Sequence, residues 1–261
     1  MKLSESGFTF NGRHCRSDMG CWWIEKDGHP ISPEIQRNEY EIAGVSGTIL
    51  MEGETRKELT FAGTLVMVQE PETQTEAQAQ LRTLMAWLDC GRQQLIFDYE
   101  PERYYLAQMD KSATWSLKNW FGGELSVTFT AQPYAYGVTA QTGTTITAGT
   151  DGDVTVQVDT FHPAPLVLTV QNTGSAPITG INVMDGRVLF SGMSLAAGKQ
   201  LVISMEAPID AQDDAGENYL PYAESFTPIL LSAGTRHIPI VLSYGSGEAG
   251  AQITASVRGR W

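Results

Sequence analysis

The residues best placed for metal chemistry in this 261-residue chain are His14, Cys15 and Cys21. Imidazole nitrogens and thiolates are the usual zinc ligands, and a structural zinc site needs four of them, commonly in closely spaced pairs. Five residues separate Cys15 from Cys21, and the remaining cysteine, Cys90, is distant in the sequence. The spacing therefore favours partly buried free thiols, and we predict no metal site.

A second candidate is the acidic segment from Asp210 to Glu217, which also contains Asp213 and Asp214. Its carboxylates could bind calcium, which takes oxygen ligands. The segment lacks the Asp-x-Asp-x-Asp-Gly pattern of an EF-hand loop. A solvated cluster of charges is therefore the favoured interpretation.

The sequence contains no motif typical of nucleophilic catalysis or of phosphate binding. It has neither a Gly-x-Ser-x-Gly turn nor the patterns Gly-x-x-x-x-Gly-Lys and Gly-x-Gly-x-x-Gly. A hydrolase acting on wall polymers would need two carboxylates about 5–10 Å apart, and no spacing singles out such a pair. We predict no catalytic residue, no cofactor and no enzyme. The histidines are scattered: His14, His29, His162 and His237.

Aromatic side chains could form a platform for sugars, which requires exposed rings beside convergent polar groups. Because aromatic residues also dominate cores and subunit interfaces, those two roles are the favoured interpretation. The candidates in the first half are Trp22, Trp23, Trp115, Trp120 and Phe121, and those in the second half are Tyr219, Tyr222, Tyr244 and Trp261.

The chain is strongly acidic, with 17 Lys and Arg against 30 Asp and Glu and a net charge of −13. Nucleic acids and anionic membranes both attract basic side chains, so we predict neither as a partner. No apolar run is long enough to span a bilayer, and the start of the chain lacks the apolar core of a secretion signal. The odd number of cysteines then indicates free thiols in a reducing cytosol.

The two halves of the chain differ in composition. Residues 1–136 hold all three cysteines and five of the six tryptophans, whereas residues 137–261 are rich in Gly, Ala, Thr and Ser. The small polar residues of 137–150 indicate a boundary. We therefore expect a first domain over 1–136, a linker over 137–150 and a second domain over 151–261.

The first half is predicted to be β-rich with one helix. Strands are expected over 3–10, 39–42, 48–51, 59–68 and 124–131, with a hairpin turn at Asn11-Gly12. The capping box Thr73-x-x-Glu76 predicts a helix over 74–89, which ends before Gly91. The helix would bury an apolar face made of Ala77, Leu81, Leu84, Met85 and Leu88. The last strand would bury Leu125, Val127, Phe129 and Ala131.

The second half is predicted to be an antiparallel β-sandwich, because short alternating segments recur between turn residues. Asp185-Gly186 predicts a hairpin, and Pro239 predicts that its strand is an edge strand or contains a bulge. Residues 206–228 are expected to form a long loop. The alternating segments are centred on Val156, Leu168, Ile203, Ile240 and Ala255.

Several segments together resemble phage distal tail proteins (the Dit family), the ring-forming adaptors at the tip of long, non-contractile tails. The order and spacing of these segments carry the resemblance, since none is a strict motif alone. They are Phe8–Gly12, Gly44–Leu50, Arg56–Val66, Leu84–Leu88, Leu95–Asp98, Tyr104–Ala107, Phe129–Tyr136, Gly234–Ile240 and Arg258–Trp261.

The resemblance implies a mainly β protein in which the first domain forms a homo-hexameric ring and the second is a galectin-like antiparallel β-sandwich outside it. The ring would join the tail tube protein to the tail-tip or baseplate hub protein and leave a lumen for DNA. The outer domain could carry a receptor-binding protein or other peripheral components. The protein would fold in the cytoplasm of the bacterial host and end in the virion, at the distal end of the tail.

Sheet edges are natural places for subunit contacts in such a ring. We expect these contacts at the first strand, at the 39–66 hairpin and at the strands that flank the helix. The net charge also suggests an acidic inner wall that does not bind DNA. The alternative function is a carbohydrate-binding module that recognises host cell-wall sugars through the second domain, which would predict saturable glycan binding.

Overall fold

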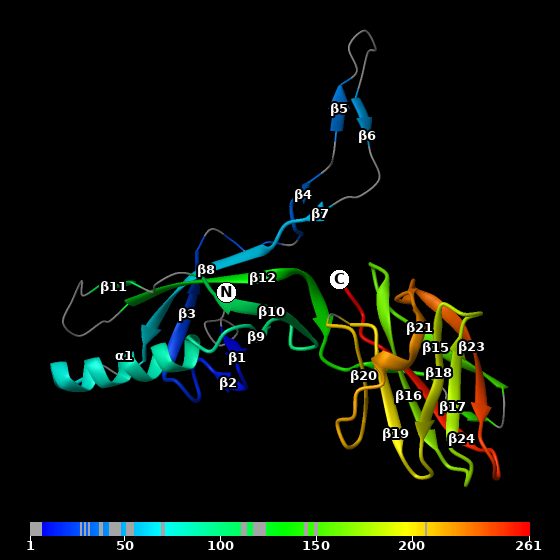
Figure 1. The fold of residues 1–261 in the computed structure, drawn as a ribbon. Coiled ribbons are helices and arrows are strands. Elements are labelled where there is room, and N and C mark those ends of the chain that lie inside the picture. The colour runs from blue at the N-terminus through cyan, green and yellow to red at the C-terminus, as the bar shows by residue number, and fades with distance from the viewer. Residues whose placement is uncertain are drawn as a thin grey trace. The chain divides into compact units, whose positions relative to one another are not determined.

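The computed structural model describes residues 7–26, 28, 30, 32–36, 39–41, 48–50, 55–68, 71–110, 114–116, 124–143, 146–148, 151–206 and 208–261. The chain divides into two compact units, 1–138 and 139–261 (Figure 1). Over the described residues the fold is mainly β with a single α-helix, which confirms the predicted fold class.

One antiparallel sheet forms the body of the first unit. Its strand order is β2-β1-β9-β10-β12-β8-β3, and β11 also pairs with β12 (Figure 1). The bounds are β1 Phe8–Phe10, β2 Arg13–His14, β3 Cys21–Glu25, β8 Leu59–Met67, β9 Gln93–Phe97, β10 Arg103–Met109, β11 Thr114–Ser116 and β12 Glu124–Gly137.

Two short antiparallel ladders of the first unit are separate from this sheet. In one, β4 (Ile35–Gln36) pairs with β7 (Thr55–Arg56), and in the other, β5 (Glu39–Glu41) pairs with β6 (Thr48–Leu50) (Figure 1). Strands were predicted at 39–42 and 48–51, so this hairpin is confirmed. The glycines between β5 and β6 lie outside the described residues.

The sequence patterns of the first unit produce the expected local structures. Asn11 and Gly12 adopt φ of 49° and 70°, and the two-residue turn joins β1 to β2 as predicted. The predicted inward side of β12, from Leu125 to Ala131, is buried. Because β12 pairs with β8 on one side and β10 on the other, it is an interior strand of the sheet.

The core of the first unit is a cluster of aromatic rings around Phe8. The Phe8 ring lies 5.1 Å from Trp23, 5.6 Å from Trp87 and 5.3 Å from Phe129, measured between centroids. All four side chains are buried. The first strand, the helix and the middle of the sheet therefore depend on the same aromatic contacts.

Helix α1 spans Gln74–Leu88 and begins as its capping signal predicts. Thr73 Oγ1 accepts a hydrogen bond from Glu76 N at 3.2 Å, and Glu76 Oε2 accepts one from Glu72 N at 3.0 Å. Trp87, absent from the predicted apolar face, is buried and donates from Nε1 to the Phe10 carbonyl at 2.7 Å. The buried helix residues are Ala77, Leu84, Trp87 and Leu88, while the predicted Leu81 and Met85 are half-buried.

Replacing Thr73 with alanine is expected to lower the free energy of unfolding of the first unit by about 1 kcal/mol, because the Glu76 amide loses its acceptor. Thr83→Ala is a matched control, since this exposed residue lies within the helix, where alanine has the higher helix propensity. Chemical denaturation followed by tryptophan fluorescence measures both changes. An equal loss of stability in the two variants would contradict the capping role.

The second unit is an antiparallel sandwich of two sheets. One has the order β13-β24-β16-β19-β20, with β14 on β24 and β22 on β16, and the other has the order β15-β23-β17-β18-β21. Apolar side chains from both sheets form one core. The first sheet contains β13 Gln141–Thr142, β14 Ile146–Ala148, β16 Ala164–Asn172, β19 Gln200–Ser204, β20 Asp210–Asp213, β22 Leu230–Leu231 and β24 Ala251–Val257. The second contains β15 Asp151–Val158, β17 Ile178–Val183, β18 Val188–Leu195, β21 Ala223–Phe226 and β23 Gly234–Tyr244.

Two segments expected to be irregular contain strands. The expected linker 137–150 contributes β13 and β14 to a sheet, both paired with β24, so the small polar residues there do not form a free connection. The expected long loop 206–228 contains β20, the 3₁₀ turn Leu220–Tyr222 and β21. β20 buries only Ala211 completely, so its apolar pattern is too short to recognise in the sequence.

The prediction of an edge or bulged strand at Pro239 is wrong, because β23 lies between β15 and β17. The Pro239 carbonyl accepts a hydrogen bond from Met184 N at 2.9 Å. Met184 has a φ of 50° and begins the turn after β17. Pro239, which has no N–H to donate, therefore lies where the β17–β23 ladder ends. An interior strand can contain a proline at such a position.

Candidate functional site

His14 holds the turn that follows β2. Its Nδ1 accepts hydrogen bonds from the Arg16 and Ser17 amides, each at 3.2 Å, so the ring proton is on Nε2. Nε2 lies 3.1 Å from Asp98 Oδ1, to which it donates. The imidazole therefore links the turn to the end of β9, and both of its nitrogens already have partners.

Cys15 and Cys21 lie at the two ends of the same turn and are buried free thiols, as predicted. Burial raises the pKa of Cys15 to about 11 and that of Cys21 to about 12. Both sulfurs are therefore protonated thiols at neutral pH. Cys15 Sγ also accepts a hydrogen bond from Phe8 N at 3.3 Å, which makes its role structural.

In the native protein, Cys15 and Cys21 are expected to resist alkylation at mildly alkaline pH, while the half-buried Cys90 reacts first. Mass spectrometry after iodoacetamide treatment measures this order. In the Cys90→Ser variant, no thiol should react until denaturant is added. Rapid native labelling of Cys15 in that variant would contradict the assigned burial.

The same thiols predict a dependence of stability on pH. Their folded pKa values lie above the ordinary value of 9.0, so the unfolded chain loses these protons first as the pH rises. The contribution to stability is thus complete below pH 9.0, and it is lost as the pH rises through about 11 for Cys15 and about 12 for Cys21. Denaturation of Cys15→Ser and wild type across this range should show a smaller loss in the variant.

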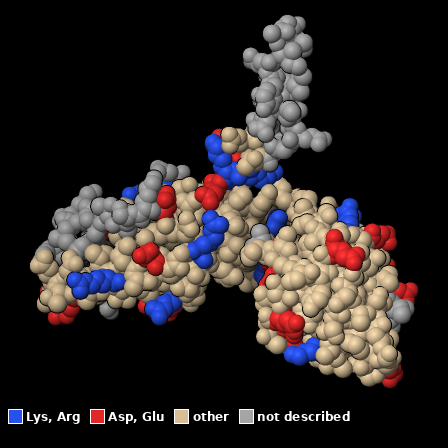
Figure 2. All heavy atoms as spheres, viewed as in Figure 1, with Lys and Arg blue, Asp and Glu red and all other residues tan. Residues whose placement is uncertain are grey.

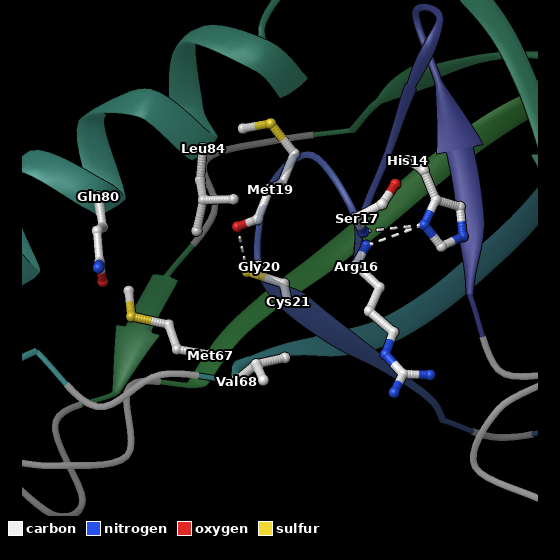
Figure 3. A pocket seen from close by; sticks show the side chains of 10 residues that line it. All are labelled: His14, Arg16, Ser17, Met19, Gly20, Cys21, Met67, Val68, Gln80 and Leu84. Atoms are coloured by element: carbon white, nitrogen blue, oxygen red, sulfur yellow. Dashed lines mark hydrogen bonds between the residues drawn. The ribbon is translucent and has the colours of Figure 1, made fainter.

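A recess of about 570 Å³ lies beside this turn (Figure 3). Met19, Met67 and Leu84 provide much of its apolar lining, and Arg16 and Gln80 add polar groups. These residues come from the turn, the end of β8 and the helix. Such a lining accommodates an apolar side chain. No local sequence pattern could have identified it, because three distant segments meet there.

Carboxylates of the acidic 210–217 segment stabilise a turn and form an ion pair. Asp213 Oδ1 accepts hydrogen bonds from the amides of Ala215 and Glu217, at 2.9 and 2.8 Å. Lys199 Nζ lies 2.9 Å from Asp214 Oδ1, and this hydrogen bond lowers the pKa of Asp214. Among the described residues, no group of three or more His, Cys, Asp or Glu side chains is arranged to hold a metal ion.

The aromatic candidates differ in exposure, and the Tyr219 and Tyr222 rings lie 5.9 Å apart. Trp23 is buried, and the Arg16 guanidinium lies 3.7 Å above the half-buried Trp22 ring. In the second unit, Tyr219 is buried and Tyr222 is exposed. Tyr244 and Trp261 are half-buried. The side chain of Trp115 and the residues Trp120 and Phe121 lie outside the described part.

Each described histidine has its own local contacts. His162 forms an isolated bridge with Arg260, and His237 Nδ1 lies 3.2 Å from Thr155 Oγ1 and 3.5 Å from Asp153 Oδ2. His14 belongs to the other unit, and His29 lies outside the described residues. The described histidines therefore serve separate local contacts.

The surface and the helix provide two further observations. On the face shown in Figure 2, side chains of both signs are interspersed over each unit and no acidic patch stands out. Among the described residues, no helix has the length and apolar character needed to cross a membrane.

Comparison with known proteins identifies a similar fold. No protein-family model and no curated protein sequence matches the chain. Among solved structures, the chain is similar to the crystal structure of SPP1 Dit (gp 19.1), described as a paradigm of the hub adsorption apparatus in phages that infect Gram-positive bacteria. The TM-score is 0.67 at 13% identity, and the match covers 97% of this chain and 98% of that one. The fold of the chain is thus similar to that of a phage hub protein over nearly its whole length.

Proposed function

We propose that the protein is a structural, non-catalytic component of a phage tail tip that assembles into a hexameric ring. The ring joins the tail tube protein to the tail-tip or baseplate hub protein, and DNA passes through its lumen. The observation that carries this proposal is the fold similarity to SPP1 Dit, which extends over both units and covers 97% of this chain. The two units correspond to a ring domain followed by a peripheral domain.

The open edge of the main sheet is the surface that best suits a ring contact. A ring needs two different, complementary surfaces on each subunit, and an unpaired strand edge is one that a neighbour can complete. The described sheet ends at β3, where Ile24 is 51% exposed, and β8 next to it continues to the exposed Val68. The β5–β6 hairpin is a second candidate contact.

The second unit is the part that would lie outside the ring. Its two sheets enclose a continuous apolar core, so it is a complete sandwich without contributions from the first unit. We interpret it as the galectin-like domain that carries a receptor-binding protein or other tip components. A lectin-like fold does not imply sugar binding, and the described aromatic side chains do not favour the carbohydrate-binding alternative.

Light scattering of the purified chain across a concentration series tests the ring. The chain weighs 28.5 kDa, and the proposal predicts a species near six times this mass. A monomer at every concentration would show that the chain does not close into a ring by itself. A glycan array would then test the sugar-binding alternative.

The Ile24→Lys variant is expected to raise the concentration needed for assembly about tenfold, because the ammonium would be desolvated at the contact. Leu230→Lys is the matched control, since Leu230 is also 51% exposed but lies in the second unit. Equal assembly of the two variants, measured by light scattering, would show that the β3 edge is not part of the ring contact.

A further inference from the structure

A second hollow of the first unit, of about 480 Å³, lies between the β1–β2 hairpin and helix α1. Arg13 from the hairpin and Arg82 from the helix line it, and Ala86 and Trp87 supply apolar surface. The position of Trp87 is set by its hydrogen bond to the Phe10 carbonyl. Two arginines from separate elements therefore line one hollow.

These two arginines differ from others in the chain. Arg92 pairs with Glu58 at 3.2 Å, and Arg236 donates to the Ser232 carbonyl at 2.8 Å. Within the described residues, neither Arg13 nor Arg82 makes an ion pair or a side-chain hydrogen bond. Acidic residues outnumber basic ones by 19 to 12 over residues 1–138, so internal partners for these guanidiniums are abundant in the sequence.

We propose that this hollow, which we call the arginine groove, binds a carboxylate-bearing segment of a partner protein. Guanidinium groups suit carboxylates because their parallel N–H donors match the two oxygens. The methylene groups of a glutamate could pack on the exposed Ala86 while its carboxylate meets the arginines. A nucleic acid is a poorer fit, because the unit is acidic and the groove offers two cations where polyanion binding uses many. This inference does not depend on the ring.

Protection of the arginines from phenylglyoxal, read by mass spectrometry on the full-length chain at low salt, tests the proposal. Hexaglutamate should lower the modification rates of Arg13 and Arg82 about threefold, and hexaglutamine should leave them unchanged. Arg236 is the internal control. Arg13→Gln should weaken the protection of Arg82, because one of the two carboxylate partners is lost, whereas Arg92→Gln should not.

Three results would overturn the proposal. The first is unchanged modification of both arginines in hexaglutamate. The second is equal protection of Arg236, which would indicate a general charge effect. The third is protection by oligothymidylate alone, which would assign the groove to nucleic acid. Because Arg13 and Arg92 are exposed, the two variants should keep the wild-type circular dichroism spectrum and unfolding transition.

Discussion

Replacing Phe8 with alanine is expected to lower the free energy of unfolding of the first unit by about 3–5 kcal/mol. Phe8 is fully buried, and its ring contacts Trp23, Trp87 and Phe129. Removing it leaves a cavity where the first strand, the helix and the sheet meet. Because buried aromatic rings contribute both transfer energy and packing, this should be among the most damaging single substitutions in the unit.

Tryptophan fluorescence during denaturation measures this change, since five of the six tryptophans lie in residues 1–136. Val68→Ala is the control in the same unit, because Val68 is 45% exposed and its truncation should change stability by only about 0.5 kcal/mol. A Phe8→Ala effect as small as that of the control would show that the aromatic cluster is not the core of this unit.

In the second unit, Asn172→Ala is expected to cost about 2–4 kcal/mol of unfolding free energy. Asn172 is fully buried, and its Nδ2 donates to the carbonyls of Ala176 and Leu195, both at 2.9 Å. Its Oδ1 accepts a hydrogen bond from Gly174 N at 3.1 Å. Alanine would leave the two carbonyls without this donor, whereas the Gly174 amide would keep its hydrogen bond to the Gly250 carbonyl.

Asn218→Ala is the control for this prediction, since Asn218 is exposed and accepts one hydrogen bond, from Leu220 N. Circular dichroism should show a destabilised transition for Asn172→Ala, while the transition seen by tryptophan fluorescence stays close to that of the wild type. A shift of the fluorescence transition alone would contradict the assignment of this network to the second unit.

The parts of the fold that sequence analysis predicted well are those in which a local pattern decides the structure. The helix begins at Gln74 because Thr73 accepts a hydrogen bond from the Glu76 amide of the first turn, and β12 forms because its apolar residues alternate. Trp87 was missed as a core residue because its burial depends on the Phe10 carbonyl and the Phe8 ring. Those contacts join segments far apart in the chain.

The elements that were predicted wrongly form because of their contacts with adjacent strands. β20 is a strand because it pairs with β19, although its own sequence predicts an acidic loop. Pro239 lies in an interior strand because the adjacent ladder ends at Met184. Likewise, the arginine groove joins Arg13 to Arg82, which are distant in sequence, so no motif could indicate it.

Immunogold electron microscopy of tailed particles from cells that carry the gene tests the central claim most directly. With an antibody against the full chain, the account predicts gold at the end of the tail away from the capsid. Gold on the capsid, or intact tailed particles that carry no label while the free protein is present in the lysate, would contradict a structural role at the tail tip.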